Sequence, residues 1–134
     1  MELNEKFNII FYNRGVGGFI TDELGINDLS YPDIPIAQMI DHYDQILCQV
    51  KAALPDVKLY LMAYYPINYD AATEEMKPCL LVRTNQKIAE ANAAVKKLAE
   101  KHHVKYIDIN DPLKDENGNL KAEYTCLLYT SDAA

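Results

Sequence analysis

The sequence predicts an α/β fold in which amphipathic helices alternate with the strands of a parallel sheet. Three short apolar runs, at 8–12, 57–63 and 104–109, have the length and the β-branched and aromatic content that are typical of buried strands. Two longer runs between them, at 36–54 and about 78–102, carry apolar residues at helical spacing. Parallel strands need a crossover, usually a helix, so this alternation favours a three-layer α/β/α arrangement around a parallel sheet.

The first strand leads into a glycine-rich turn. The apolar run of residues 9–12 is followed by Gly15, Gly17 and Gly18, three glycines within four residues. Glycine adopts positive φ and lets a ligand approach backbone N–H groups. A turn of this kind after a strand can bind an anion or stabilise a developing negative charge. It can equally be a tight turn without chemistry, because glycine turns after strands are common.

The first helix follows residues 30–35, a turn-rich segment with two prolines. The helix is expected over 36–54, where Pro55-Asp56 ends it. Its apolar stripe consists of Ile36, Met39, Ile40, Tyr43, Ile46, Leu47, Val50 and Leu54. Because a stripe of this width packs against a core, we expect the helix to cover one face of the sheet.

The second helix is expected as one long element from about Pro78 to His102. Its inward face is predicted to consist of Leu81, Asn85, Ile88, Asn92, Val95 and Ala99. After the strand at 104–109, residues 115–119 (Asp-Glu-Asn-Gly-Asn) are a strong turn signal. We find no internal repeat and no low-complexity linker, which indicates a single domain.

Composition and charge exclude several classes of protein. The 134 residues, of which 49% are hydrophobic, are enough for one domain with a modest core. The formal net charge of -7 argues against binding to nucleic acid or to an anionic membrane surface. No apolar run approaches the length of a membrane span. Cys48, Cys79 and Cys126 form no close-spaced metal motif, and their odd number is typical of a reducing compartment, which slightly favours the cytoplasm.

Two short motifs resemble a known family. The motif Asn-x-Gly-x-x-Gly ends at Gly18, and Gly-x-Asn-Asp follows it with its asparagine at Asn27. In this order they resemble blocks II and III of the SGNH (GDSL-type) ester hydrolases. The stretch 83–108 is also similar to the last long helix of that family and the strand after it. The resemblance covers nearly all of 8–125, and we interpret residues 1–125 as a partial SGNH-hydrolase-like domain.

The resemblance implies an ester hydrolase that works without a metal or another cofactor. In SGNH enzymes, the serine of a Gly-Asp-Ser motif attacks the ester, and the histidine of an Asp-x-x-His motif is the base. The oxyanion donors are the N–H of that serine, the N–H of the block II glycine and the side chain of the block III asparagine. Gly18 and Asn27 match the last two positions, and Asp28 would fix the loop after block III. The implied substrates are small esters, such as acetyl groups on sugars, cleaved through an acyl-serine intermediate.

The chain departs from the family pattern in three places. No Gly-Asp-Ser precedes Ile9, and Asp-x-x-His is absent, with Tyr124-Thr125 where the approach to it would begin. A crossover of roughly 20–30 residues is expected between Leu24 and Gly25, where the sequence has no room for it. We therefore expect an incomplete fold that carries only the oxyanion side of the site and is inactive as given.

The C-terminal residues do not continue the α/β pattern. Residues 126–134 resemble the translation of an adapter used in sequencing libraries, and we interpret them as a non-native tail. The alternative is a short amphiphilic C-terminal segment. If the tail is non-native, Cys126 carries no information about the redox environment.

Two other interpretations remain open. The chain could be a non-enzymatic α/β binding module of flavodoxin-like or receiver-like shape, although a receiver needs paired acids where Tyr12-Asn13 stands. It could also be a structural remnant without a function. At the level of single residues, Asn27-Asp28 could be an Asx turn or a helix cap. The two histidines at the end of the second helix are explained without catalysis, because a helix C-terminus favours positive charge.

Overall fold

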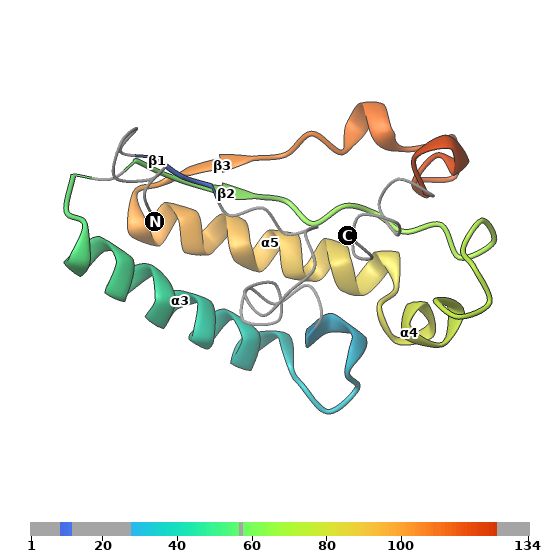
Figure 1. The fold of residues 1–134 in the computed structure, drawn as a ribbon, viewed down its shortest axis with the longest axis horizontal. Coiled ribbons are helices and arrows are strands. Elements are labelled where there is room, and N and C mark those ends of the chain that lie inside the picture. The colour runs from blue at the N-terminus through green and yellow to red at the C-terminus, as the bar shows by residue number, and fades with distance from the viewer. Residues whose placement is uncertain (1–8, 12–27, 57, 126–134) are drawn as a thin grey trace.

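The structure is a computed structural model, and it describes residues 9–11, 28–56 and 58–125. Figure 1 shows their arrangement, and along the chain they form β1 (Ile9–Phe11), η1 (Asp28–Ser30), α3 (Ile36–Ala53), β2 (Lys58–Met62), α4 (Lys77–Val82), α5 (Asn85–His102), β3 (Lys105–Ile107) and η2 (Asp111–Leu113). None of the described helices is both long enough and apolar enough to cross a membrane.

The three strands form one parallel sheet in the order β1-β2-β3. Ile10 pairs with Leu59 between β1 and β2, and Leu61 pairs with Tyr106 between β2 and β3. Strand β2 is therefore central, and a long helix precedes each of the next two strands, α3 before β2 and α5 before β3. This order confirms the predicted parallel arrangement of the three apolar runs.

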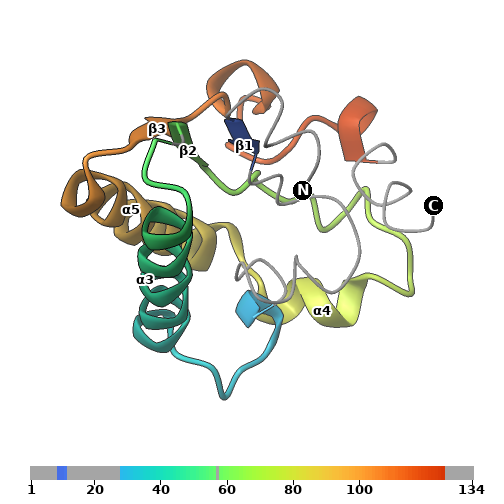
Figure 2. The same ribbon diagram turned by 60° about the vertical axis from the view of Figure 1, so that its left-hand side comes forward.

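Both long helices lie on the same side of the sheet, as Figures 1 and 2 show. Successive side chains of a strand point to opposite faces, and in β2 Leu59 and Leu61 are buried toward the helices while Tyr60 and Met62 are half-buried. The core is completed by Met39, Tyr43 and Leu47 of α3 and by Ile88, Ala91, Val95, Leu98 and Ala99 of α5. The described residues thus supply the sheet and one helical layer of the expected α/β/α fold.

Helix α3 confirms the predicted first helix to within one residue at its end. It follows Pro35, and the backbone N–H of Leu54 closes it by bonding to Val50 O. The predicted stripe faces the core, with Met39, Tyr43 and Leu47 buried and Ile36, Ile40, Ile46 and Val50 packed partly buried beside them. The helical period of the apolar residues was therefore sufficient to orient this element.

Polar contacts join α3 to the end of α5. The Asp44 carboxylate accepts a hydrogen bond from Lys101 Nζ through Oδ2 at 2.6 Å, and its Oδ1 lies against His102 Nε2. Lys51 Nζ also donates to the backbone oxygen of His102 at 2.9 Å. Hydrogen bonds from Lys101 and His102, of which the one from Lys101 has the larger effect, hold the pKa of the Asp44 carboxyl below its usual value of 3.8. Asp44 is therefore a charged link between the two helices at neutral pH.

The prediction of one helix over 78–102 is wrong, because this stretch forms two helices, α4 and α5. Thr84 between them has an extended backbone (φ -79°, ψ 158°), and its Oγ1 accepts a hydrogen bond from Lys87 N at 3.2 Å. A threonine caps the first turn in this way only when its own backbone leaves helical geometry, so α4 and α5 are separate. As a consequence Leu81, predicted to face inward, is 66% exposed.

The predicted turn at 115–119 is confirmed. Asp115 Oδ1 accepts hydrogen bonds from Asn117 N and Asn119 N, each at 2.9 Å. Gly118 has a φ of 81°, a conformation that glycine adopts without steric cost. The turn reverses the chain, so that the residues after it return toward the end of β2.

Candidate functional site

The carboxyl ends of the three parallel strands point to one edge of the sheet, where α/β proteins bind their ligands. Residues 63–68 leave β2 at this edge and residues 108–110 leave β3 (Figure 1). The segment that leaves β1 contains the predicted Gly18 and lies outside the described residues. The structure therefore describes the part of this edge that β2 and β3 form.

An asparagine of α5 fixes the backbone where it leaves β2. Asn92 Oδ1 accepts a hydrogen bond from Tyr64 N at 2.7 Å, and Asn92 Nδ2 donates to Tyr64 O at 2.9 Å. Asn110, which follows β3, donates to the same carbonyl from its Nδ2 at 2.9 Å. A side-chain amide offers one acceptor and two donors, so it can pair with a backbone N–H and C=O as a neighbouring strand would. The chain consequently keeps a defined path after the pairing of β2 with β3 has ended.

A second asparagine of α5 fixes the next part of this loop. Asn85 Oδ1 accepts a hydrogen bond from Ile67 N at 2.7 Å, and Asn85 Nδ2 donates to Ile67 O at 3.0 Å and to Asn119 Oδ1 at 2.9 Å. Leu120 N donates to the same Ile67 carbonyl at 3.2 Å. Asn68 Nδ2 then donates to Leu120 O at 2.8 Å. The loop after β2 is thus bound both to α5 and to the segment that follows the 115–119 turn.

The stretch directly after Asn27 is described, and it is tied to α5. Leu29 of η1 is 1% exposed and belongs to the core. Lys87 Nζ donates to Leu29 O at 2.9 Å and to Tyr31 O at 3.3 Å. One end of the predicted oxyanion segment is therefore anchored to the same helix that fixes the loop after β2.

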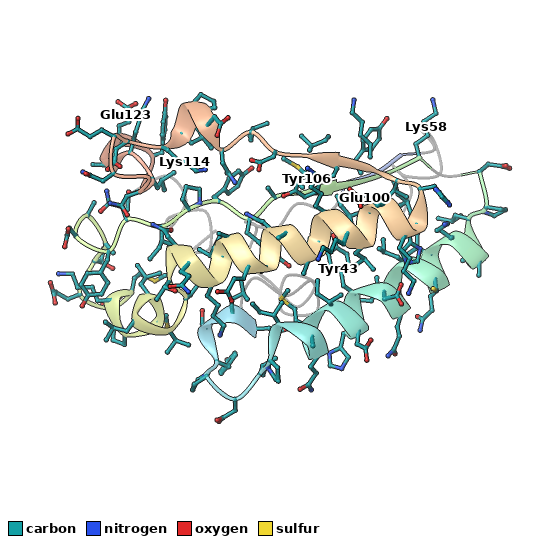
Figure 3. The ribbon with its side chains drawn as sticks, turned by 180° about the vertical axis from the view of Figure 1, so that it is seen from behind. Tyr43, Lys58, Glu100, Tyr106, Lys114 and Glu123 are labelled. Atoms are coloured by element: carbon teal, nitrogen blue, oxygen red, sulfur yellow. The ribbon has the colours of Figure 1, made fainter. Side chains whose placement is uncertain are left out.

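A groove of about 700 Å³ runs beside the ends of β2 and β3. Figure 3 labels Tyr106 and Lys114, which contribute to its lining. Asn110 reaches it with a side chain that is 3% exposed, and Asn110 Oδ1 has no hydrogen-bond partner among the described residues. None of its described lining residues is Ser, Thr, Cys or His, so the described part of the groove contributes neither a serine nucleophile nor a histidine base.

The histidines do not supply this pair elsewhere in the described part of the chain. His42 is exposed on α3, as expected from its place off the apolar stripe. His103 is exposed at the end of α5. His102 is 8% exposed and is bonded to Asp44, so the helix dipole alone does not account for it. In the described residues, no hydrogen bond joins any of the three to a serine or a threonine.

Comparison with protein families accounts for the sequence motifs. The model of the GDSL-like lipase/acylhydrolase family matches residues 5–131 of the chain. The chain belongs to this family. Its parallel sheet and the resemblance of its glycine and asparagine motifs to SGNH (GDSL-type) hydrolases agree with the match. The family's description names lipases and acylhydrolases, which are enzymes that hydrolyse ester bonds.

Among solved structures, the chain is similar to a protein from Streptococcus pneumonia that is provisionally described as a platelet activating factor. The two are 30% identical with a TM-score of 0.65, and the similarity covers 75% of this chain. The chain spans 45% of the length of that relative. No curated protein gave a significant match.

Gly18 and Asn27, the predicted oxyanion residues of this GDSL-like chain, both lie outside the described residues. The described residues resume at Asp28, the first residue of η1, which directly follows Asn27 in the sequence. Tyr124 and Thr125, where the approach to the family's histidine motif would begin, are described, and Thr125 is 1% exposed. These two residues follow the segment that is hydrogen-bonded to the loop after β2.

Four asparagines around this edge show roles that sequence reasoning missed. Asn85 and Asn92 were expected on the inward face of a helix, which is correct, but as packing residues rather than as partners of the β2 loop. The sequence did indicate these roles, because a polar residue within an otherwise apolar helical stripe needs a buried hydrogen-bond partner. Asn110 and Asn119 carried no such signal, because they follow no periodic pattern.

Proposed function

We propose that this chain is part of a serine ester hydrolase that acts on small esters, including acetylated carbohydrates, through an acyl-serine intermediate. The observation that carries the proposal is the family match over residues 5–131. The parallel sheet supports it, because its carboxyl edge is where such a site would form.

In this proposal the N–H of Gly18 and the side-chain amide of Asn27 are two donors of the oxyanion hole. An asparagine amide suits this role because it donates hydrogen bonds without carrying a charge that would need a counterion. The hydrogen bonds from Lys87 to Leu29 and Tyr31 support the proposal, since they anchor the chain just beyond Asn27. A donor whose segment is anchored needs little reorganisation as negative charge develops on the substrate.

The chain as given is proposed to be inactive. Its sequence contains neither Gly-Asp-Ser nor Asp-x-x-His, and its described histidines are engaged elsewhere or exposed. We further propose that residues 1–125 are a partial domain of the family and that residues 126–134 are not native.

The first experiment measures hydrolysis of p-nitrophenyl acetate by the chain as given. We expect the rate to equal the background rate of a catalytically inert protein, and Asn27→Ala to leave it unchanged. Robust hydrolysis that disappears when a single serine is replaced would contradict the proposal that the nucleophile is absent.

The second experiment restores the missing parts. In a chimera, a complete GDSL-like enzyme would supply a first strand with Gly-Asp-Ser, a crossover between Leu24 and Gly25 and an Asp-x-x-His segment. Asn27→Ala in an active chimera should lower kcat by about a hundred- to a thousand-fold, the usual cost of one oxyanion donor. KM should change little, because the donor acts mainly on the transition state.

Asn117→Ala is the matched control, because Asn117 is an exposed asparagine of the 115–119 turn whose described hydrogen bond uses its backbone N–H. The control should retain the activity of the chimera. If Asn27→Ala is as active as Asn117→Ala, Asn27 is not an oxyanion donor.

A further inference from the structure

Three side chains with different metal-binding atoms meet where α3 faces the end of α5. Asp44 and Cys48 lie one helical turn apart on α3, so they share one side of that helix. His102 is the last residue of α5. One carboxylate oxygen, the thiol sulfur and one ring nitrogen all lie within 4.8 Å of one another. Figure 3 labels Tyr43 and Glu100, which are close to these residues in sequence on the two facing helices.

This donor set matches the coordination chemistry of zinc. Zinc binds thiolate, imidazole and carboxylate ligands at about 2.0–2.3 Å, so its tetrahedral geometry places the ligand atoms about 3.3–3.8 Å apart. The three atoms lie within 4.8 Å of one another, so the widest separation exceeds this spacing by about 1.0–1.5 Å at most. Asp44 Oδ1 and His102 Nε2 are in hydrogen-bond contact and have to move apart when an ion enters between them. Cys48 is exposed, and rotation of its side chain can bring the sulfur closer.

We propose that Asp44, Cys48 and His102 together bind a divalent transition-metal ion, with Zn²⁺ as the best fit, at the amino end of β3. The site would be a link between α3 and α5. It lies at the end of the sheet opposite the carboxyl edge, because β3 begins just after His102. Neither the family nor the proposed ester hydrolysis requires this ion.

The contacts around the three residues leave the necessary atoms available. Lys101 holds Asp44 Oδ2, whereas Oδ1 faces His102 Nε2, so an ion can take the place of the proton between this oxygen and nitrogen. Metal-binding carboxylates commonly keep a hydrogen bond to a neighbouring group, and Lys101 fills that role here. The His102 ring is 8% exposed, and Lys51 bonds to its backbone oxygen, so the imidazole is held in place before an ion arrives.

The charge and the connectivity of the site also favour binding. One carboxylate and one thiolate neutralise a dication, so the site does not add net charge beside Lys101. Asp44 and His102 are 58 residues apart in sequence. An ion that joins them closes a long loop of the chain, and its binding free energy adds to the stability of the folded state. Three protein ligands leave a fourth position for water.

Cobalt titration tests the site, because Co²⁺ replaces Zn²⁺ in tetrahedral sites and reports its ligands by absorption. The parent protein is the full chain with Cys79→Ser and Cys126→Ser, which leaves Cys48 as its single cysteine. We expect one Co²⁺ per chain, visible d–d bands of tetrahedral cobalt and a near-ultraviolet thiolate-to-cobalt band. Zn²⁺ should abolish all of these bands and raise Tm.

Variants identify the ligands. Cys48→Ser, at an exposed position that the fold tolerates, should remove the thiolate band. Asp44→Asn should weaken Co²⁺ binding by at least about tenfold. Replacing a group that only contacts a metal ligand already lowers metal affinity by about this factor, and Asp44 is proposed to be a ligand itself. His42→Ala replaces an exposed histidine on α3 and should leave both the bands and the affinity unchanged. The proposal is overturned if the parent protein shows no thiolate band, if the band survives Cys48→Ser, or if Asp44→Asn binds Co²⁺ as tightly as the parent.

Discussion

Replacing Asn92 by alanine should destabilise the protein far more than the loss of one polar side chain on a helix usually does. Asn92 pairs with both the N–H and the C=O of Tyr64, a residue that is 1% exposed. The carbonyl keeps the hydrogen bond from Asn110 in the variant. The N–H loses its acceptor in a buried position, and this loss dominates the cost.

The magnitude follows from these contacts. A buried donor left without its acceptor costs about 1–3 kcal/mol, and the lost hydrogen bonds contribute about 1 kcal/mol more. The higher helix propensity of alanine offsets about 0.5 kcal/mol of this loss of stability. We therefore expect Asn92→Ala to lower the free energy of unfolding by about 1.5–3.5 kcal/mol, which for a domain of this size lowers Tm by about 5–12 °C.

Urea unfolding followed by circular dichroism measures this difference. Asn92→Asp keeps an acceptor for Tyr64 N, but it replaces the Nδ2 donor with a carboxylate oxygen that faces the Tyr64 carbonyl, so this variant should also be destabilised. Gln86→Ala is the matched control, because Gln86 is exposed on the same helix and its hydrogen bond among the described residues is to exposed Glu90. It should change the free energy of unfolding by less than about 0.5 kcal/mol. If Asn92→Ala is no more destabilising than Gln86→Ala, the asparagine does not hold the loop after β2.

Three further predictions concern the helices, and each is measured by urea unfolding. Thr84→Ala should destabilise by about 1 kcal/mol, because it removes the N-cap of α5, and no loss would mean that the cap is not formed in solution. His103→Gly should stabilise by about 0.5–1 kcal/mol, since His103 holds a left-handed conformation (φ 55°, ψ 40°) that glycine adopts freely, and a destabilised variant would refute this. With a chelator present, the wild type should have a larger free energy of unfolding than Asp44→Asn. This difference should be complete above pH 3.8 and decline as the pH falls below it, because Lys101 and His102 lower the pKa of Asp44 in the folded state. An advantage that grows toward acid pH would contradict that sign.

The sequence alone was sufficient for the elements whose signals are local. The three apolar runs became the parallel strands, and the helical stripe of 36–54 became the buried face of α3. The turn at 115–119 formed as predicted, because Asp115 bonds to backbone groups within the turn itself. In each case the residues that decide the structure lie within a few positions of one another.

The separation of α4 from α5 shows where a local pattern was misread. The apolar spacing continues past Thr84, and spacing alone predicts one helix. The capping hydrogen bond of Thr84 and the bonds from Asn85 to Ile67 instead require a new helix to begin there. Thr84 before the final helix was a usable local signal, whereas the hydrogen bonds of Asn85 that accompany the break involve Ile67, 18 residues away.

The candidate site divides in the same way. Short motifs in the sequence were enough to indicate the family and to nominate Gly18 and Asn27, which stay predictions because they lie outside the described residues. The asparagine contacts around the loop after β2, and the meeting of Asp44 with Cys48 and His102, came only from the tertiary structure. Periodicity and motif spacing report on neighbours in sequence, whereas Asp44 and His102 are 58 residues apart and meet only because α3 and α5 pack on the same face of the sheet.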